Sequence, residues 1–397
     1  MPGLLRQQNG RRSVMTRAGG AEEGGLRVLQ CVQQFIYHTP RWKLIVVLLL
    51  STLIKTGIWF MPNLDSTALI ASNPFVNPFS NPDAHYLLTS WLGLYGAWLI
   101  GATSERLLFC YFLLFSMLFS ALFMRLLLTR LPDAAARTAL VLFTLLPVSG
   151  TSYFWAGIDG ITLCLITLAL LQRDRPSPLL LLTGILLGMQ HFEQSFFGFG
   201  AVLLALWLNK VWRADAAGGY SLRWAVCLLV GIVLGKFVLQ LLFQHFALHL
   251  NSGRMYWLHN HLPALVGQTL LHLHLVLWSA LGLGWVVALA WAERGKAAWP
   301  MLLALAGLLL LLPVSGDQTR VLAIVTLPLL SVYWLLNSAF LDSLNRTLVS
   351  ALFSLSLMLP WSWVWEGLPR WSALPFDIAL LLQRFEVLPT TMRIWPF

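Results

Sequence analysis

The chain has 397 residues, of which 58% are hydrophobic and 11% are charged, and its mean hydropathy is +0.73. An average soluble domain carries roughly 25% charged residues, so the composition excludes an ordinary soluble protein and indicates a polytopic membrane protein. The formal charge of +10 is interpreted as a topology signal with an added contact to anionic lipid. Nucleic-acid binding is not expected, because no aromatic and basic recognition module accompanies this charge.

Apolar runs predict an all-α transmembrane bundle of about eleven spans. The basic segment 1–42 has no signal-like apolar core and is expected to be a cytoplasmic arm. Segment 43–365 is expected to be the transmembrane domain, and 366–397 a tail on the outer face with an amphipathic helix over 375–388. The spans are expected near 43–62, 106–130, 136–150, 160–172, 178–192, 195–209, 222–248, 264–292, 298–314, 319–337 and 347–365. After the first span, a short helix over 87–102 is expected to lie at the membrane interface.

The orientation follows from the basic residues, because Lys and Arg resist translocation. Most of the 26 Lys and Arg residues fall in segments that share one side when the N-terminus is cytoplasmic. An odd number of spans then places the C-terminus outside. The expected location is the inner membrane of a bacterium, with the C-terminus in the periplasm.

The ionisable residues of the other loops gather on the predicted outer side. An ionisable group near hydrocarbon is costly and usually faces protein, water or a substrate, so this one-sided collection suggests a shared chamber. The candidate catalytic residues are Asp83, His85, His191 and Glu193. The candidate substrate-binding residues are Asp159, Lys236, Arg254, His259, Asp317 and Arg320.

Several of these residues also have a purely structural interpretation. Asp83 and Asp159 could each cap a helix, and Asp317 and Arg320 could pair with one another on one helix face. Lys236, in the middle of a span, could snorkel or pair with a carboxylate. The histidines around His259 lack the cysteines or the HExxH pattern of a zinc site. No cofactor is firmly implied, and a divalent metal is left open without support.

The layout suits glycosyl transfer from a lipid-phosphate sugar. Such a reaction needs a cationic group to neutralise the leaving phosphate and a carboxylate or imidazole to deprotonate an acceptor hydroxyl. Arg254 and Arg320 are candidates for the first task. Asp83 is the candidate base, and His191 and Glu193 are acceptor-site groups. The chain has no GxxxxGK[ST] loop and no GxSxG elbow, so neither nucleotide hydrolysis nor serine-hydrolase chemistry is expected.

Three short segments carry a family resemblance. They are SNPDAHY after the first span, the segment from LLPVSG to GIDG, and the start GDQTR of a late span. All three resemble parts of the GT-C class of membrane glycosyltransferases. The resemblance covers most of the chain in layout but only short motifs in sequence. It implies a polyprenyl-phosphate-linked sugar as donor, a glycan or lipid as acceptor, and Asp83 as the base. This chain departs from the pattern because His85, and no second acid, follows Asp83.

Three classes of function remain open from the sequence. The first is a glycosyltransferase, or a polysaccharide polymerase of the same lipid-linked chemistry. The second is a transporter or flippase of a lipid-linked or anionic substrate, which would need polar groups along both halves of a path. The third is a non-catalytic assembly subunit, in which the outer ionisable groups need not converge.

Overall fold

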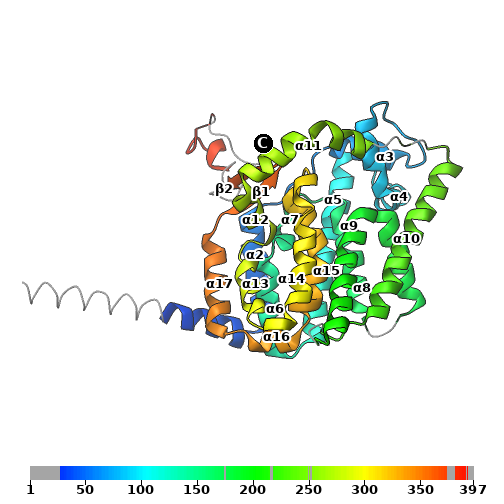
Figure 1. The fold of residues 1–397 in the computed structure, drawn as a ribbon. Helices are drawn as coiled ribbons and strands as arrows, with labels where there is room; N and C mark the ends of the chain where they lie inside the picture. Colours follow the sequence, from blue (N-terminus) through cyan, green and yellow to red (C-terminus); the bar gives the residue numbers. More distant parts are fainter. Residues whose placement is uncertain are drawn as a thin grey trace, which may run out of the picture.

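The computed structural model describes residues 27–173, 176–214, 218–248, 250, 253–372, 381–389 and 391. These residues form a bundle of helices with a two-stranded sheet at one end (Figure 1). Residues 27–38 are helical. The elements that follow are α2 (Arg41–Thr56), α3 (Leu64–Ser72), the 3-10 helix η1 (Pro82–Ser90), α4 (Trp91–Leu99), α5 (Glu105–Arg130), α6 (Asp133–Leu145), α7 (Pro147–Phe154), α8 (Asp159–Leu171), α9 (Pro178–Trp212), α10 (Leu222–His245), α11 (Gly253–Leu271), α12 (Leu273–Leu281), α13 (Gly284–Ala292), η2 (Gly295–Ala297), α14 (Trp299–Leu309), η3 (Leu312–Val314), α15 (Gln318–Leu330), the π-helical η4 (Ser331–Leu335), α16 (Ser338–Ser343), α17 (Arg346–Met358), β1 (Trp361–Trp365) and β2 (Leu368–Ser372).

The two ends of the bundle differ in what they carry. One end, named here the α11 end, holds α3, α11 and the β1–β2 hairpin, whereas α16 lies at the opposite, α16 end (Figure 1). Basic loops meet at the α16 end, where Arg130 Nη2 donates to Leu171 O at 2.7 Å and Arg173 Nη1 donates to Gly218 O at 3.2 Å. The sequence predicts this gathering of basic loops. Which side of a membrane this end faces stays a prediction.

Helix α9 reverses direction at His191, whose backbone is not helical (φ −158°, ψ 82°). A straight helix of its 35 residues would be about 52 Å long. Before His191, Gly184 lies against Gly231 and Gly188 against Gly235, so this leg runs beside α10 in the same direction. After His191, the ring of Phe199 lies 5.8 Å from that of Trp224, back near the start of α10. The chain therefore leaves the α16 end along 178–190 and returns along 192–212. This agrees with two separate helical segments predicted near 178–192 and 195–209.

The predicted number of eleven spans is not confirmed. Within the described residues, four helices are long and apolar enough to cross a membrane, or up to six if each bent pair is one span. The four are α5, α9, α10 and the continuous α15–η4 segment. Several other helices are short, and α8, for example, has 13 residues and a length of about 20 Å. The described chain is thus mostly helical, with several helices that could cross a membrane and many that are short or broken.

Two predicted spans are not confirmed as single straight helices, because the chain bends inside them. The span expected over 264–292 comprises the end of α11, α12 and α13, with an 85° bend between α11 and α12. Gly282, with φ of 55°, ends α12 in a conformation that favours glycine. The span expected over 136–150 is also divided, because α6 and α7 meet at Pro147 with a 54° bend. Proline at the first helical position suits the start of a new helix.

The last predicted span, 347–365, is wrong at its outer end, and the fold is not purely α-helical. Helix α17 ends at Met358, and the segment WSWVW forms β1, which pairs antiparallel with β2. Pro360 stands between the helix and the strand, and Gly367, with φ of 76°, lies in the turn. Alternating tryptophans favour a strand over a helix. Most of the expected tail helix over 375–388 lies outside the described residues.

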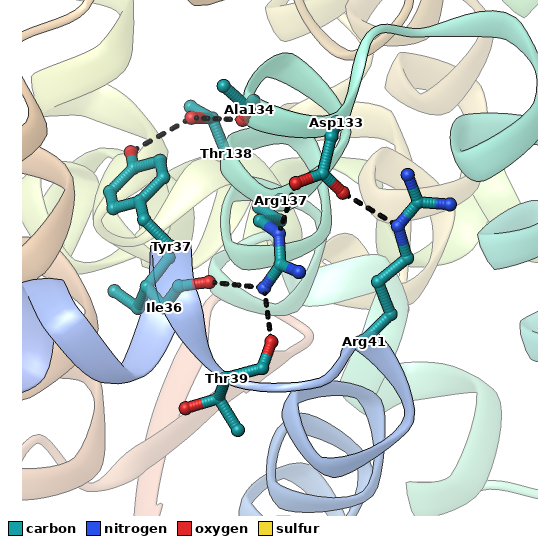
Figure 2. A network of polar contacts seen from close by, with 8 residues as sticks. All are labelled: Ile36, Tyr37, Thr39, Arg41, Asp133, Ala134, Arg137 and Thr138. Carbon is teal, nitrogen blue, oxygen red and sulfur yellow. Dashed lines mark hydrogen bonds and ion pairs between the residues drawn. The ribbon is translucent and has the colours of Figure 1, made fainter.

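The N-terminal helical segment is attached to α6 by a buried arginine (Figure 2). Arg137 Nη1 donates to Ile36 O at 2.9 Å and to Thr39 O at 2.7 Å, and Arg137 Nε pairs with Asp133 at 2.9 Å. Arg41 Nε pairs with the other oxygen of Asp133 at 2.6 Å. These basic residues, which the sequence presents as a topology signal, therefore also join segments far apart in the chain.

The outgoing leg of α9 packs against α10 through glycines. Gly184 and Gly188 face Gly231 and Gly235, four residues apart on each helix. A Cβ added to Gly184 would lie 2.6 Å from Leu228 O and 2.9 Å from the Cα of Gly231. Small residues at this spacing let two helix backbones approach closely inside a membrane. This contact fixes α10, and with it Lys236, beside the reversal of α9 at residues 190–193. This reversal is named here the apex of α9.

Candidate functional site

Three of the predicted site residues form one buried ionic cluster, named here the Arg320 cluster. Arg320 Nε lies 3.3 Å from Asp159 Oδ2 and 3.0 Å from Asp317 Oδ2. The side chains of Asp159 and Asp317 are 7% and 5% exposed, and that of Arg320 is 23% exposed. Asp159 begins α8, whereas Asp317 and Arg320 begin α15. Residues distant in the sequence therefore meet where two helices start.

Helix capping explains Asp317 but not Asp159. Asp317 is the N-cap of α15 and accepts a hydrogen bond from Arg320 N at 3.4 Å, so the predicted pairing of these two residues is confirmed. Asp159 is instead the first residue of α8, and its side chain makes no cap hydrogen bond. Burying a carboxylate without a structural partner other than Arg320 is costly, which marks Asp159 as a candidate for function.

The Arg320 cluster keeps unused hydrogen-bonding capacity. Asp159 Oδ1 is buried and has no hydrogen-bond partner among the described residues. The guanidinium of Arg320 contacts both carboxylates through Nε, which leaves its two Nη groups without an ion pair in the described part of the chain. Burial raises the pKa of the Asp317 carboxyl to about 7, against the lowering effect of Arg320 and with a further raising effect of Asp159. Asp317 Oδ2 is likewise buried without a hydrogen-bond partner among the described residues, so the cluster can both accept and donate further hydrogen bonds.

Two aromatic residues, Trp155 and Tyr86 of η1, interact with Arg320. The guanidinium carbon lies 5.9 Å from the ring centroid of Trp155, in the range of a cation–π contact. Tyr86 of η1 interacts electrostatically with Arg320. Asp83 is the second residue of the same 3-10 helix, three residues before Tyr86. Its side chain lies outside the described residues, as does that of Arg254 on α11.

The β1–β2 hairpin holds the start of α15 in place. Trp365 forms an isolated bridge with Asp317, Val364 N donates to Thr319 Oγ1 at 2.9 Å, and Gly367 N donates to Gln318 Oε1 at 2.8 Å. Trp365 also packs on Trp155 with ring centroids 5.3 Å apart. The hairpin, which sequence reasoning missed, thus orients both the acid and the aromatic wall of the cluster. The alternation of WSWVW was the signal that could have found it.

A second ionic group lies at the apex of α9. Glu193 Oε1 is 3.9 Å from Lys236 Nζ on α10, and Glu193 Oε2 is 3.9 Å from His191 Nδ1. Lys236 Nζ also lies 5.4 Å from the ring centroid of Phe192. The structure therefore brings His191, Glu193 and Lys236 together, and the predicted pairing of Lys236 with a carboxylate is confirmed.

Gln190 connects the apex of α9 with the start of α8. Its Nε2 donates to Ile158 O at 3.2 Å, and its Oε1 accepts from Gly93 N of α4 at 2.7 Å. Ile158 directly precedes Asp159, so the two ionic groups flank the same buried polar bridge. Sequence reasoning missed Gln190, although it stands in the QHFEQ motif beside two residues that were selected.

Two of the remaining predicted residues, His85 and His259, have described side chains. His85 is buried, with Nε2 3.2 Å from Phe79 O, and His259 is exposed on α11. Among the described residues, no group of three or more His, Cys, Asp or Glu side chains could hold a metal ion. Of the ten predicted site residues, six therefore fall into the two ionic groups.

Comparison with protein-family models, with curated proteins and with solved structures finds no match to this chain. Its function is therefore argued from the two ionic groups and their surroundings.

Proposed function

We propose that the chain is a membrane glycosyltransferase that moves a sugar from a polyprenyl-phosphate donor to a lipid-linked glycan, a lipid or a polysaccharide at the outer face. The observation that carries the proposal is the Arg320 cluster, in which a partly used guanidinium and an unpartnered carboxylate oxygen lie side by side. Glycosyl transfer needs such a pair, because a phosphate leaves while a hydroxyl attacks.

The roles follow from the atoms that remain available. The Nη groups of Arg320 bind the phosphate of the donor, since a guanidinium can donate two parallel hydrogen bonds to phosphate oxygens. Asp159 Oδ1 accepts the proton of the acceptor hydroxyl as that oxygen bonds to the sugar carbon and the lipid phosphate departs. Asp317 holds the guanidinium in place. Asp83, the base that the GT-C resemblance implies, is the competing assignment for the proton acceptor.

The proposal is tested in cells from which the gene is deleted, by analysis of their lipid-linked and surface glycans. Asp159→Asn, Asp83→Asn and Arg320→Lys are expressed at equal protein levels, with Asp65→Asn as the control because Asp65 is an exposed acid of the neighbouring α3. Loss of the true base should lower product formation by roughly 10²- to 10⁴-fold. Glycans that do not change on deletion, or full activity of both Asp159→Asn and Asp83→Asn, would refute the proposal.

Breaks in the helices favour one alternative function, transport of a lipid-linked or anionic substrate. The described chain breaks at His191 and bends by 54° between α6 and α7 and by 85° between α11 and α12. Transporters often build their binding sites from such discontinuous helices.

Reconstituted vesicles distinguish the two functions. A fluorescent lipid phosphate that crosses the bilayer faster when the chain is present would support transport. Release of the sugar from a labelled polyprenyl-phosphate donor, without faster lipid crossing, would support glycosyl transfer. A polymerase of the same lipid-linked chemistry would differ from a single transferase only in product length.

A further inference from the structure

A polar cavity, named here the Lys55 cavity, has no residue of either ionic group in its wall. It has a volume of about 70 Å³, room for several water molecules. Its walls come from α2, the α6–α7 and α12–α13 junctions, the end of α17 and the start of β1. Among the described residues, Lys55 is the one charged residue that lines it, and the wall also includes Ser51, Thr144, Ser279, Ser356 and Trp361.

Lys55 is a half-buried cation without a matching anion. Its ammonium donates to the backbone carbonyl of Ser356, and it has no carboxylate partner in the described part of the chain. A charge taken out of water is stable only when an opposite charge or several hydrogen bonds compensate it. One carbonyl uses one of the three ammonium protons, so two remain for a ligand.

The other polar groups of the cavity indicate what kind of ligand fits. Ser51 donates to Leu48 O at 2.8 Å, Thr144 to Val141 O at 2.8 Å, and Ser279 to Val276 O at 2.9 Å. These hydroxyl protons are therefore already used inside their own helices. The indole N–H of Trp361, in contrast, is buried without an acceptor among the described residues. That nitrogen has almost no exposed surface, so the donor that a ligand in the cavity can reach is the ammonium of Lys55, and a cation calls for an anionic oxygen ligand.

The mouth of the cavity borders an apolar surface. Leu357, which lines the cavity, is 55% exposed, and Ile54, beside Lys55, is 56% exposed. Met358 is 82% exposed. Large exposed aliphatic side chains on a membrane protein are expected to contact lipid tails.

We propose that the Lys55 cavity binds a phosphate-type anion, separate from the Arg320 cluster, with the headgroup of a membrane lipid as the source that its apolar mouth favours. The ammonium of Lys55 donates to the phosphate oxygens, while the acyl chains lie along Leu357 and Ile54. The proposal does not depend on glycosyl transfer.

The test measures phosphatidic acid binding to the purified full chain by native mass spectrometry in a neutral detergent. Lys55→Met removes the charge but keeps an unbranched side chain, and Lys43→Met, an exposed lysine of the same helix, is the matched control. A hydrogen bond to a charged group corresponds to roughly a tenfold to hundredfold change in affinity. The apparent Kd should rise by that factor in Lys55→Met and should not change in Lys43→Met.

Two further arms identify the source of the anion and protect the test against misfolding. Inorganic phosphate that competes with phosphatidic acid at low millimolar concentration would support the cavity but assign it to a free anion. Ser51→Leu fills the cavity and keeps the lysine, so it should weaken binding even if Lys55→Met does not fold. Unchanged phosphatidic acid affinity in both Lys55→Met and Ser51→Leu would overturn the proposal.

Discussion

Replacing Arg320 by glutamine should strongly destabilise the protein. The substitution leaves Asp159 and Asp317, each more than nine-tenths buried, without the cation that lies 3.3 Å and 3.0 Å from their oxygens. Removing one partner of a buried ion pair typically costs about 3–5 kcal/mol, because the remaining charge stays buried and uncompensated. The free energy of unfolding should fall by that amount at pH 8. The loss should be smaller at pH 5, where the carboxyl groups can take up protons.

The free energy of unfolding can be measured by titrating the purified chain with sodium dodecyl sulfate in mixed micelles. Arg320→Gln is compared with the double variant Arg320→Gln/Asp317→Asn, which removes one of the two buried negative charges and should recover part of the loss. Arg106→Gln is the control, since Arg106 is an exposed arginine at the start of α5. Surface substitutions of this kind usually change stability by less than about 0.5 kcal/mol.

Two results would refute this reasoning about Arg320. A loss below about 1 kcal/mol in Arg320→Gln would mean that the carboxylates find compensation elsewhere, or that they are already protonated. Because asparagine keeps the N-cap of α15, a double variant less stable than Arg320→Gln would mean that the charge of Asp317 is not what destabilises Arg320→Gln.

Gly188→Leu should separate α9 from α10 and lower the folded yield severalfold in size-exclusion chromatography. A Cβ at Gly188 would collide with Ile232. Nothing lies within 4 Å of a Cβ at Gly200, so Gly200→Leu should leave the folded yield unchanged. Gln190→Leu leaves the Gly93 amide and a buried carbonyl unpaired and should cost about 1–3 kcal/mol in the same detergent titration; no measurable loss would disprove the bridge. Because burial raises the pKa of Asp317 to about 7, its proton stabilises the folded chain below pH 3.8, and this contribution is lost as the pH rises through 7. Asp317→Asn should flatten that part of the stability profile between pH 5 and 8, and an unchanged slope would contradict it.

The sequence predicts helical content and loop grouping better than it predicts helix ends. Hydropathy located α5 almost residue for residue, because that helix is long and uniformly apolar. It failed at α11–α13 and at β1, where the chain bends or changes structure without becoming polar. A window that averages hydropathy does not register an 85° bend, and tryptophans score as apolar in a strand as they do in a helix.

The sequence pointed to most residues of the two ionic groups, but it could not predict which of them contact each other. Asp159, Asp317 and Arg320 each stood out as ionisable residues at span ends, yet their contact depends on where α8 and α15 begin in space. Gln190 and Trp361 gave no comparable signal, because an amide and an indole are common in membrane proteins. Their importance follows only from unsatisfied or bridging hydrogen bonds in the folded chain.

The pair of Glu193 and Lys236 provides a test of whether the apex of α9 lies in a water-poor environment. Lys236 stands near the middle of the 24-residue helix α10, with Nζ 3.9 Å from Glu193. The exposed pair of Arg41 and Asp133 is closer, at 2.6 Å (Figure 2). In water the closer pair should be the stronger one, yet exposed pairs contribute only about 0–1 kcal/mol because solvent screens them. A double-mutant cycle with Glu193→Gln and Lys236→Met should therefore give a coupling energy above about 1 kcal/mol, and one with Arg41→Gln and Asp133→Asn a smaller value. Equal couplings, or a larger one at Arg41, would place the apex in water and remove the reason to regard it as part of a membrane-embedded site.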